Sequence, residues 1–287
     1  MIAATVRDAI TARVAASGFR ARGVHVRVGS DEAVHRWTPD TREDIHSVSK
    51  GVCVLAAAMA ADEGLLSFDT PIVEYLEVPE VGSGTELVTL RHLLTMTTGV
   101  DFPWSETLLT DHPDLAVEYL RRPSRGRQFQ YSNASTYTAM RVLHVRVGDI
   151  PAFLEPRLWE PLGIRDVTWD RCPRGFIAAG GGLHLRTEEL ARVGRLIGDR
   201  GVWGEQRLLS AEWIDLMHTQ TVVAGTGPSY SRYGLAGWGG PGAAWRLHGA
   251  YGQLVIFAGN AVVTVTADDH DGADAMAEFI AEQIEDL

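Results

Sequence analysis

Lysine is almost absent from this sequence. The 287 residues include 26 lysines and arginines together, and Lys50 alone among them is a lysine. Both residues serve equally well as solvated cations. Only an amine can lose its proton near neutral pH once it is desolvated, because a guanidinium titrates above about 12. Because Lys50 is the only side-chain amine among so many guanidinium groups, it is the first candidate for a catalytic residue.

Cysteine is also scarce, and long apolar runs are missing. Cys53 lies inside an apolar stretch and Cys172 in a proline-flanked loop, so we expect no disulfide framework and interpret Cys53 as a small core residue. No apolar run reaches the roughly 18 residues of a membrane span. The first eight residues carry an acid and precede no small-residue cleavage site, unlike a signal peptide. We therefore expect no membrane partner and a cytoplasmic location.

Positive charge is in deficit, and several catalytic signatures do not occur. The formal net charge of −11 at pH 7 argues against a nucleic-acid partner. No G-x-S-x-G is present, which disfavours a Ser-His-Asp hydrolase. The ten histidines are scattered rather than set at metal-ligand spacing, so we expect no metal and no other cofactor. Gly180-Gly181-Gly182 lacks the lysine of a phosphate loop and is interpreted as a tight turn.

The segment around Lys50 predicts a buried helix with a reactive hydroxyl at its start. Ser47-Val48-Ser49-Lys50 leads into an alanine-rich run that is apolar on every side until Asp62-Glu63-Gly64, the pattern of a buried helix closed by a glycine. Residues three apart share a helix face, so the Ser47 hydroxyl and the Lys50 amine are expected to meet. Desolvation favours the neutral amine, which makes Lys50 a candidate base for a nucleophilic Ser47. The simpler interpretation is a helix-capping serine beside a surface cation.

Strand patterns occur at both ends of the chain, and helical patterns fill the middle. Two hairpins are predicted, at 23–37 and at 254–266, the second turning at Gly259-Asn260. Helices are predicted from apolar spacing and turn residues at 2–17, 90–96, 115–122, 132–147, 151–158, 187–201, 210–218 and 271–286.

These elements predict an α/β (α+β) fold in one catalytic unit. An antiparallel sheet built from both termini, residues 1–64 and 164–287, is flanked by helices and carries an all-α insertion at 65–163. The active site is expected between the two regions.

Two further clusters can supply partners for Ser47 and Lys50. Tyr131-Ser132-Asn133 opens a predicted helix, where a tyrosine hydroxyl can transfer protons and an asparagine amide can donate to a carbonyl. His248-Gly249-Ala250, followed by Tyr251, ends a predicted strand. Small residues there let the backbone approach a ligand and present an N–H to an oxyanion. Four loop aromatics are interpreted as core or rim packing: Phe102, Trp104, Trp238 and Tyr251.

In this order the motifs resemble the serine β-lactamase and penicillin-binding-protein-like hydrolases, in the class C-like branch that includes esterases, D-amino-acid peptidases and amidases. Ser47 to Lys50 matches S-x-x-K, Tyr131 to Asn133 matches Y-x-N, and His248 to Ala250 resembles the K-T-G or H-x-G strand. The resemblance covers nearly the whole chain. It implies a β-lactamase/transpeptidase-like fold.

The resemblance also implies roles for the motif residues. Ser47 would be the acylated nucleophile, with Lys50 and Tyr131 sharing the proton transfers, and either of the two could be the base. Asn133 would contact the substrate. The N–H of Ser47 and one near Ala250 or Tyr251 would form the oxyanion hole. No E-x-x-L-N element supplies a deacylating glutamate.

The third motif departs from the family pattern, with His248 for the lysine, Gly249 for the hydroxyl residue and Ala250 for the glycine. An unperturbed histidine is mostly neutral at pH 7, so a substrate carboxylate would lose a fixed cation. We therefore expect a hydrolase of small-molecule esters or amides, with weak or absent action on β-lactams. The alternative is a noncatalytic β-lactam- or peptide-binding sensor or scaffold on the same fold. The sequence gives no indication of oligomeric state.

Overall fold

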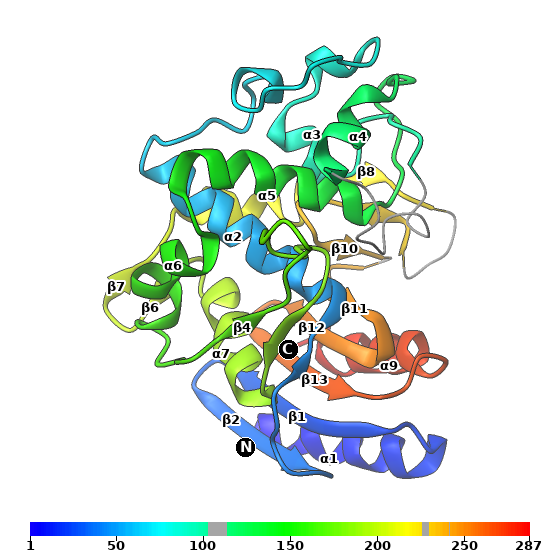
Figure 1. Cartoon of the computed structure of the whole chain (residues 1–287). Coiled ribbons are helices and arrows are strands. Elements are labelled where there is room, and N and C mark those ends of the chain that lie inside the picture. The colour runs from blue at the N-terminus through cyan, green and yellow to red at the C-terminus, as the bar shows by residue number, and fades with distance from the viewer. Residues whose placement is uncertain (103–113, 226–229, 241) are drawn as a thin grey trace.

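An antiparallel sheet forms the centre of the computed structural model, which describes residues 1–102, 114–225, 230–240 and 242–287 (Figure 1). Within these residues its strands pair in the order β2-β1-β13-β12-β11-β10-β9-β8. The two ends of the chain meet where β1 pairs with β13, as the sequence predicts. The strands are β1 Ala21–Val28, β2 Asp31–Arg36, β8 Val222–Val223, β9 Arg232–Tyr233, β10 Trp238–Gly239, β11 Trp245–Gly249, β12 Gln253–Ala258 and β13 Ala261–Ala267.

Helices cover both faces of this sheet. Strand β12 is buried along its whole length, and its side chains alternate between two hydrophobic clusters. Leu254 and Ile256 pack in the cluster of α1 (Ile2–Ser17) and α9 (Ala273–Ile284). Val255 and Phe257 belong to the cluster that includes α7 (Thr187–Gly198) and α2 (Ser49–Asp62). Because both faces are covered, the sheet is a fixed support for α2.

Helix α2 crosses the middle of the molecule between the sheet and the helical region (Figure 1). Every residue from Ser49 to Ala60 is buried, as the alanine-rich pattern predicts. Gly51 lets the helix approach β11, since a Cβ there would lie 2.5 Å from Leu247 Cδ1. Gly64 follows the helix with a φ of 70°, which is the predicted glycine terminus.

The described residues between Leu65 and Gly163 form helices and single turns. Helix α5 (Asn133–Val147) packs against α2, α3 and α4 and links this region to the centre of the molecule. The other elements are η2 Ile72–Glu74, η3 Thr85–Leu87, α3 Leu90–Leu94, α4 Leu115–Arg121, α6 Ile150–Leu154 and a π-helical turn at Glu155–Trp159. The sequence predicted the last two as one helix. Trp104 lies outside the described residues.

Short elements return the chain from the helical region to the sheet. Strand β5 (Leu183–Leu185) pairs with β4 (Thr168–Trp169) and with β3 (Glu43–Asp44), which ends shortly before Ser47. Next come β6 Val202–Trp203, β7 Gln206–Arg207 and α8 Ala211–Leu216. The sequence did not predict β8, β9 and β10, because two-residue strands are too short for alternation to show. No helix in the described ranges combines the length and apolar character needed to cross a membrane.

Candidate active site

Ser47 lies in a single 3-10 turn, His46–Val48, directly before α2. The sequence placed it in the first turn of the helix itself. The chain instead bends at His46, whose φ of 48° is left-handed and costs a non-glycine residue on the order of 1–3 kcal/mol. Helix α2 begins at Ser49, whose Oγ donates to the His46 carbonyl at 2.6 Å. Ser47 therefore does not cap the helix.

Lys50 is buried in a ring of acceptors. It is 2% exposed, which excludes the surface-cation interpretation. Its Nζ lies 3.0 Å from Ser47 Oγ, 2.7 Å from Asn133 Oδ1 and 2.9 Å from the Gly180 carbonyl. The amide oxygen and the carbonyl can only accept, so they hold two N–H groups in either protonation state. The third position of the amine faces Ser47: an ammonium donates to the hydroxyl there, and a neutral amine offers its lone pair.

Asn133 and Gly180 come from distant segments and meet only around Lys50. Asn133 is the first residue of α5. A Cβ on Gly180 would lie 2.6 Å from Asn133 Oδ1, so the close approach requires glycine. The sequence predicted Asn133 as a substrate contact, and its oxygen is already used by Lys50. The sequence analysis gave no role to the Gly180 carbonyl. The three consecutive glycines were the one feature of the sequence that could have indicated a close backbone approach there.

Tyr131 approaches Lys50 with the face of its ring. The Lys50 Nζ lies 4.9 Å from the ring centroid, within the distance range of cation–π contacts. The ring also packs near Trp238 and Tyr233, with centroids 5.5 and 6.0 Å away. In the part of the chain that the structure describes, the Tyr131 hydroxyl has no hydrogen-bond partner. The predicted residue is thus brought to the pair with its hydroxyl unoccupied.

The end of β11 lies against the turn that carries Ser47. A Cβ on Gly249 would lie 2.5 Å from the Ile45 carbonyl and 3.2 Å from the Ser47 nitrogen. Glycine is therefore needed for contact with the serine turn. The close approach to a ligand, for which the sequence predicted small residues here, stays a prediction. Ala250 and Tyr251 follow in the turn Ala250–Gly252. Tyr251 has a φ of 60°, is 45% exposed, and places its ring 5.1 Å from that of His46.

His248 is engaged away from Ser47 and Lys50. Its ring nitrogens lie 2.5 and 3.1 Å from the Tyr230 hydroxyl, which donates to Asp274 at 2.5 Å. Burial, followed by the Arg246 charge, lowers the pKa of His248 from 6.5 to about 4. The described contacts of this ring include neither Ser47 nor Lys50. The structure therefore brings the backbone of this motif, rather than the His248 side chain, to the serine.

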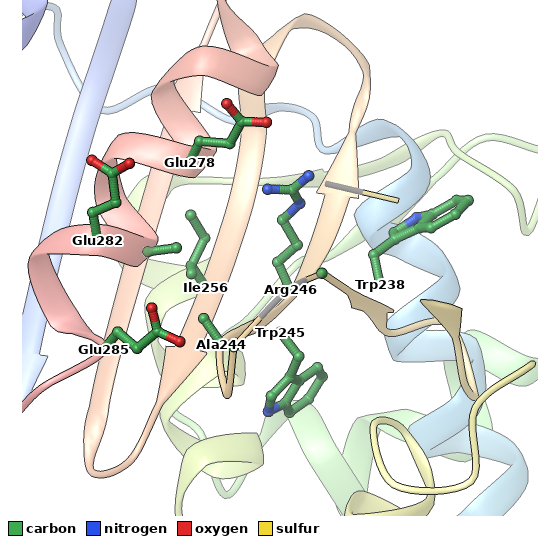
Figure 2. Close-up of a pocket in the computed structure, with 11 residues that line it drawn as sticks. Trp238, Ala244, Trp245, Arg246, Ile256, Glu278, Glu282 and Glu285 are labelled. Carbon is green, nitrogen blue, oxygen red and sulfur yellow. The ribbon is translucent and has the colours of Figure 1, made fainter. Parts of the chain in front are cut away.

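Aromatic residues pack against Tyr131. Trp238 packs against Tyr131 and Tyr230 and also lines a cavity of about 390 Å³ between β11 and α9 (Figure 2). That cavity is lined by other residues, including Arg246 and the α9 glutamates, and not by the predicted site residues. Phe102 is buried beside Tyr119, which is core packing. Trp238 packs against Tyr131, and Tyr251 packs against His46, the residue before Ser47.

The described residues contain no group of three or more histidine, cysteine or acidic side chains able to hold a metal ion. The polar groups around Ser47 are instead an amine, an amide, backbone groups and a phenol. This set suits proton transfer to and from a hydroxyl.

Comparison with known sequences places the chain in a family. The profile of the family described as Beta-lactamase matches residues 6–284. The chain belongs to the β-lactamase family. The kinship expected from the motifs with the β-lactamase-related hydrolases is thereby confirmed.

A curated relative agrees with the family assignment. The 6-aminohexanoate-dimer hydrolase of Paenarthrobacter ureafaciens is 31% identical over 205 residues, which is 62% of this chain and 51% of that protein. The chain thus spans about half the length of this curated relative.

Solved structures of other proteins share the fold. A penicillin-binding protein from Bacillus halodurans superposes with a TM-score of 0.74 at 19% identity, covering 95% of this chain and 98% of that one. The D-amino acid amidase from Ochrobactrum anthropi SV3 does so with a TM-score of 0.76 at 14% identity, covering 98% and 99%. The predicted β-lactamase/transpeptidase-like fold, with helices around an antiparallel sheet, is confirmed.

Proposed function

We propose that this member of the β-lactamase family is a serine hydrolase that cleaves a small-molecule amide or ester through an acyl-enzyme on Ser47. The observation that carries the proposal is the 3.0 Å contact between Ser47 Oγ and the Nζ of the buried Lys50. Asn133 Oδ1 and the Gly180 carbonyl each accept a hydrogen bond from Lys50 Nζ. The third substituent position of the amine therefore points at the Ser47 hydroxyl. A nucleophile with an oriented base is the arrangement that covalent catalysis requires.

The proton transfers are shared between Lys50 and Tyr131. Lys50, as a neutral amine, takes the proton of Ser47 while Oγ bonds to the substrate carbonyl carbon. We assign this first step to Lys50 because it contacts the hydroxyl, whereas Tyr131 is held to the amine by its ring. The bond between the carbonyl carbon and the leaving group then breaks, the leaving group takes a proton from Tyr131, and Lys50 passes its extra proton to Tyr131. Water next attacks the ester carbon, the bond from that carbon to Ser47 Oγ breaks, and Lys50 and Tyr131 carry a proton from the water to Oγ.

Backbone groups stabilise the oxyanion. The Ser47 nitrogen lies beside Gly249 at the end of β11, and within the described chain its N–H has no hydrogen-bond partner. The second donor is a backbone N–H of Ala250 or Tyr251 in the next turn. Preorganised N–H groups of this kind typically contribute about 3–4 kcal/mol to transition-state stabilisation.

The site draws on both parts of the chain. Ser47 and Gly249 belong to the sheet region, 1–64 and 164–287, and Asn133 and Tyr131 to the helical region, 65–163. We therefore propose that the two regions act as one catalytic unit with the substrate between them.

Small amides and esters are the substrates that these features favour. The curated relative is named for hydrolysis of a 6-aminohexanoate dimer and a structural neighbour is named as a D-amino acid amidase. We therefore rank amides above esters as substrates. Burial holds the pKa of His248 at about 4, so its ring is neutral at pH 7. The ring is also bound to Tyr230 rather than turned to Ser47. Penicillins, which carry a carboxylate, should therefore react slowly.

The test is intact-mass measurement after incubation with a p-nitrophenyl ester, a D-amino acid amide and a penicillin, with turnover followed in parallel. Wild-type protein should turn over the ester and an amide and show a transient acyl adduct, and Ser47→Ala should show neither. Turnover that survives in Ser47→Ala, or no adduct and no turnover in the wild type, would refute the proposal. A stable adduct without turnover would support the sensor alternative.

A further inference from the structure

Asp44 connects the two backbone segments that hold the Ser47 and Lys50 pair. Its Oδ1 accepts a hydrogen bond from the His46 N–H at 2.7 Å and another from the Gly182 N–H at 2.8 Å. Its Oδ2 lies 3.3 Å from His46 Nδ1. One carboxylate thus joins the turn that carries Ser47 to the glycine segment whose Gly180 carbonyl accepts from Lys50.

The turn and the glycine segment both need such a restraint. His46 is in the left-handed region, which is costly for a residue other than glycine. Ala179, directly before Gly180, has a φ of 63° and is strained in the same way. A charged acceptor makes stronger hydrogen bonds than a neutral one, so a single carboxylate can hold both N–H groups.

The surroundings place Asp44 where a small movement reaches the reacting atoms. It pairs with His184 in the ladder between β3 and β5, and the Ile45 N–H donates to the Leu183 carbonyl. These bonds fix the backbone on the carboxyl-terminal side of the glycine segment. Within the segment, the Gly182 carbonyl accepts from the Asp170 N–H and the Gly181 carbonyl from Trp169 Nε1, and the Gly182 N–H is held by the Asp44 side chain. Loss of the carboxylate would release the N–H groups of Gly182 and His46 together. The serine turn and the Gly180 carbonyl could then shift relative to each other, and the Lys50 amine with them.

We propose that Asp44 is a positioning residue, which sets the distance and direction between Lys50 and Ser47 without touching substrate. This inference rests on the proposed function, because it assigns Asp44 a part in the same acylation step. It predicts a loss in kcat rather than in KM, since misplacement of reacting groups by ~1 Å can cost ~10²-fold in rate.

Three variants separate positioning from general stability. Asp44→Ala should lower kcat for a p-nitrophenyl ester at least ~10-fold with KM nearly unchanged, and Asp44→Asn, which keeps Oδ1, should recover it to within ~3-fold of wild type. Asp62→Ala is the matched control. Its carboxylate also joins two N–H donors of a distant segment, Ser210 N and Trp213 Nε1, but at the far end of α2. It should reduce thermal stability and leave kcat within ~2-fold.

The lone lysine provides a readout that does not depend on turnover. Protein labelled with [13Cε]lysine gives one lysine signal, from Lys50. That signal should shift in Asp44→Ala, return toward the wild-type position in Asp44→Asn, and stay unchanged in Asp62→Ala.

The outcomes distinguish this inference from the proposed function. An unshifted Lys50 signal together with wild-type kcat in Asp44→Ala would overturn the positioning role while Ser47 remains the nucleophile. Equal losses in Asp44→Asn and Asp44→Ala would overturn it in the form stated, because the acceptor Oδ1 would then not be what matters. Activity that persists in Ser47→Ala would refute the proposed function, and the Lys50 signal would still decide the role of Asp44.

Discussion

Lys50 Nζ lies 2.7 Å from Asn133 Oδ1, across 83 positions of sequence. This contact joins the helix that begins beside Ser47 to the helix that begins beside Tyr131. It also fixes one of the three directions of the amine, so the geometry at Ser47 depends on both parts of the chain. The first three predictions below disturb this arrangement one group at a time.

Replacing the lone amine tests whether Lys50 acts as a base. Lys50→Arg keeps the positive charge and loses the titratable proton. Acylation by a p-nitrophenyl ester should fall by ~10²–10⁴-fold, as measured by stopped-flow release of p-nitrophenol. Circular dichroism should show that the fold is kept. Near-normal acylation in this variant would mean that Lys50 is not a required base.

The glycine segment offers a pair of neighbouring substitutions with opposite expectations. A Cβ at Gly180 would lie 2.6 Å from Asn133 Oδ1, whereas a Cβ at Gly181 would make only ordinary contacts of 3.7–3.8 Å. Gly180→Ala should push Asn133 from Lys50 and lower kcat by ~10-fold or more. Gly181→Ala should keep nearly full activity. Steady-state kinetics of both variants provide the check, and equal activities would contradict the assigned contact.

Removing the Tyr131 hydroxyl should affect amides more than activated esters. A p-nitrophenolate leaves without a proton, whereas an amine must be protonated as it departs. Tyr131→Phe keeps the ring beside Lys50 and Trp238, so the ratio of amide to ester kcat/KM should fall by ~10²-fold or more.

The control for Tyr131 is Tyr233→Phe. The Tyr233 hydroxyl is buried without a hydrogen-bond partner in the described structure, although its ring packs 6.0 Å from that of Tyr131. Its loss should leave the ratio unchanged. An unchanged ratio in Tyr131→Phe as well would assign the proton donor elsewhere.

His248 should make the protein less stable in mild acid. The unfolded chain binds a proton on this residue near pH 6.5, whereas burial keeps the pKa in the folded protein at about 4. Unfolding therefore takes up a proton between these values. The stability from the neutral ring is fully present above pH 6.5 and is lost as the pH falls toward 4, by about 3 kcal/mol in total.

Urea unfolding at pH 7 and at pH 4.5 measures this effect. Wild type contains other groups that titrate in acid, so the comparison is with His248→Gln, whose free energy of unfolding should change less between the two pH values. Parallel losses in the two proteins would show that His248 does not contribute.

Part of the site was predictable because its members are close in sequence. Ser47 and Lys50 are three residues apart, and a helical backbone brings such residues together whatever surrounds them. The buried helix, the hairpin at Gly259-Asn260 and the helical middle region follow from local periodicity in the same way. The strands β8 to β10 could not be predicted, since their residues carry no pattern and pair only because β11 is already in place.

The remaining features arise from contacts between distant segments. The predicted role of His248 at the wall of the cleft lacks support, because Tyr230 and Asp274 hold its ring elsewhere. Nothing near Asp44 in the sequence indicates that it would bind Gly182, 138 positions away. The sequence by itself predicted the proposed nucleophile, the amine beside it and the buried helix that begins at Ser49 between them, because backbone geometry acts within a few residues. Tertiary structure alone decided which carbonyl, amide and carboxylate surround that amine, because those positions depend on how the sheet and the helical region pack together.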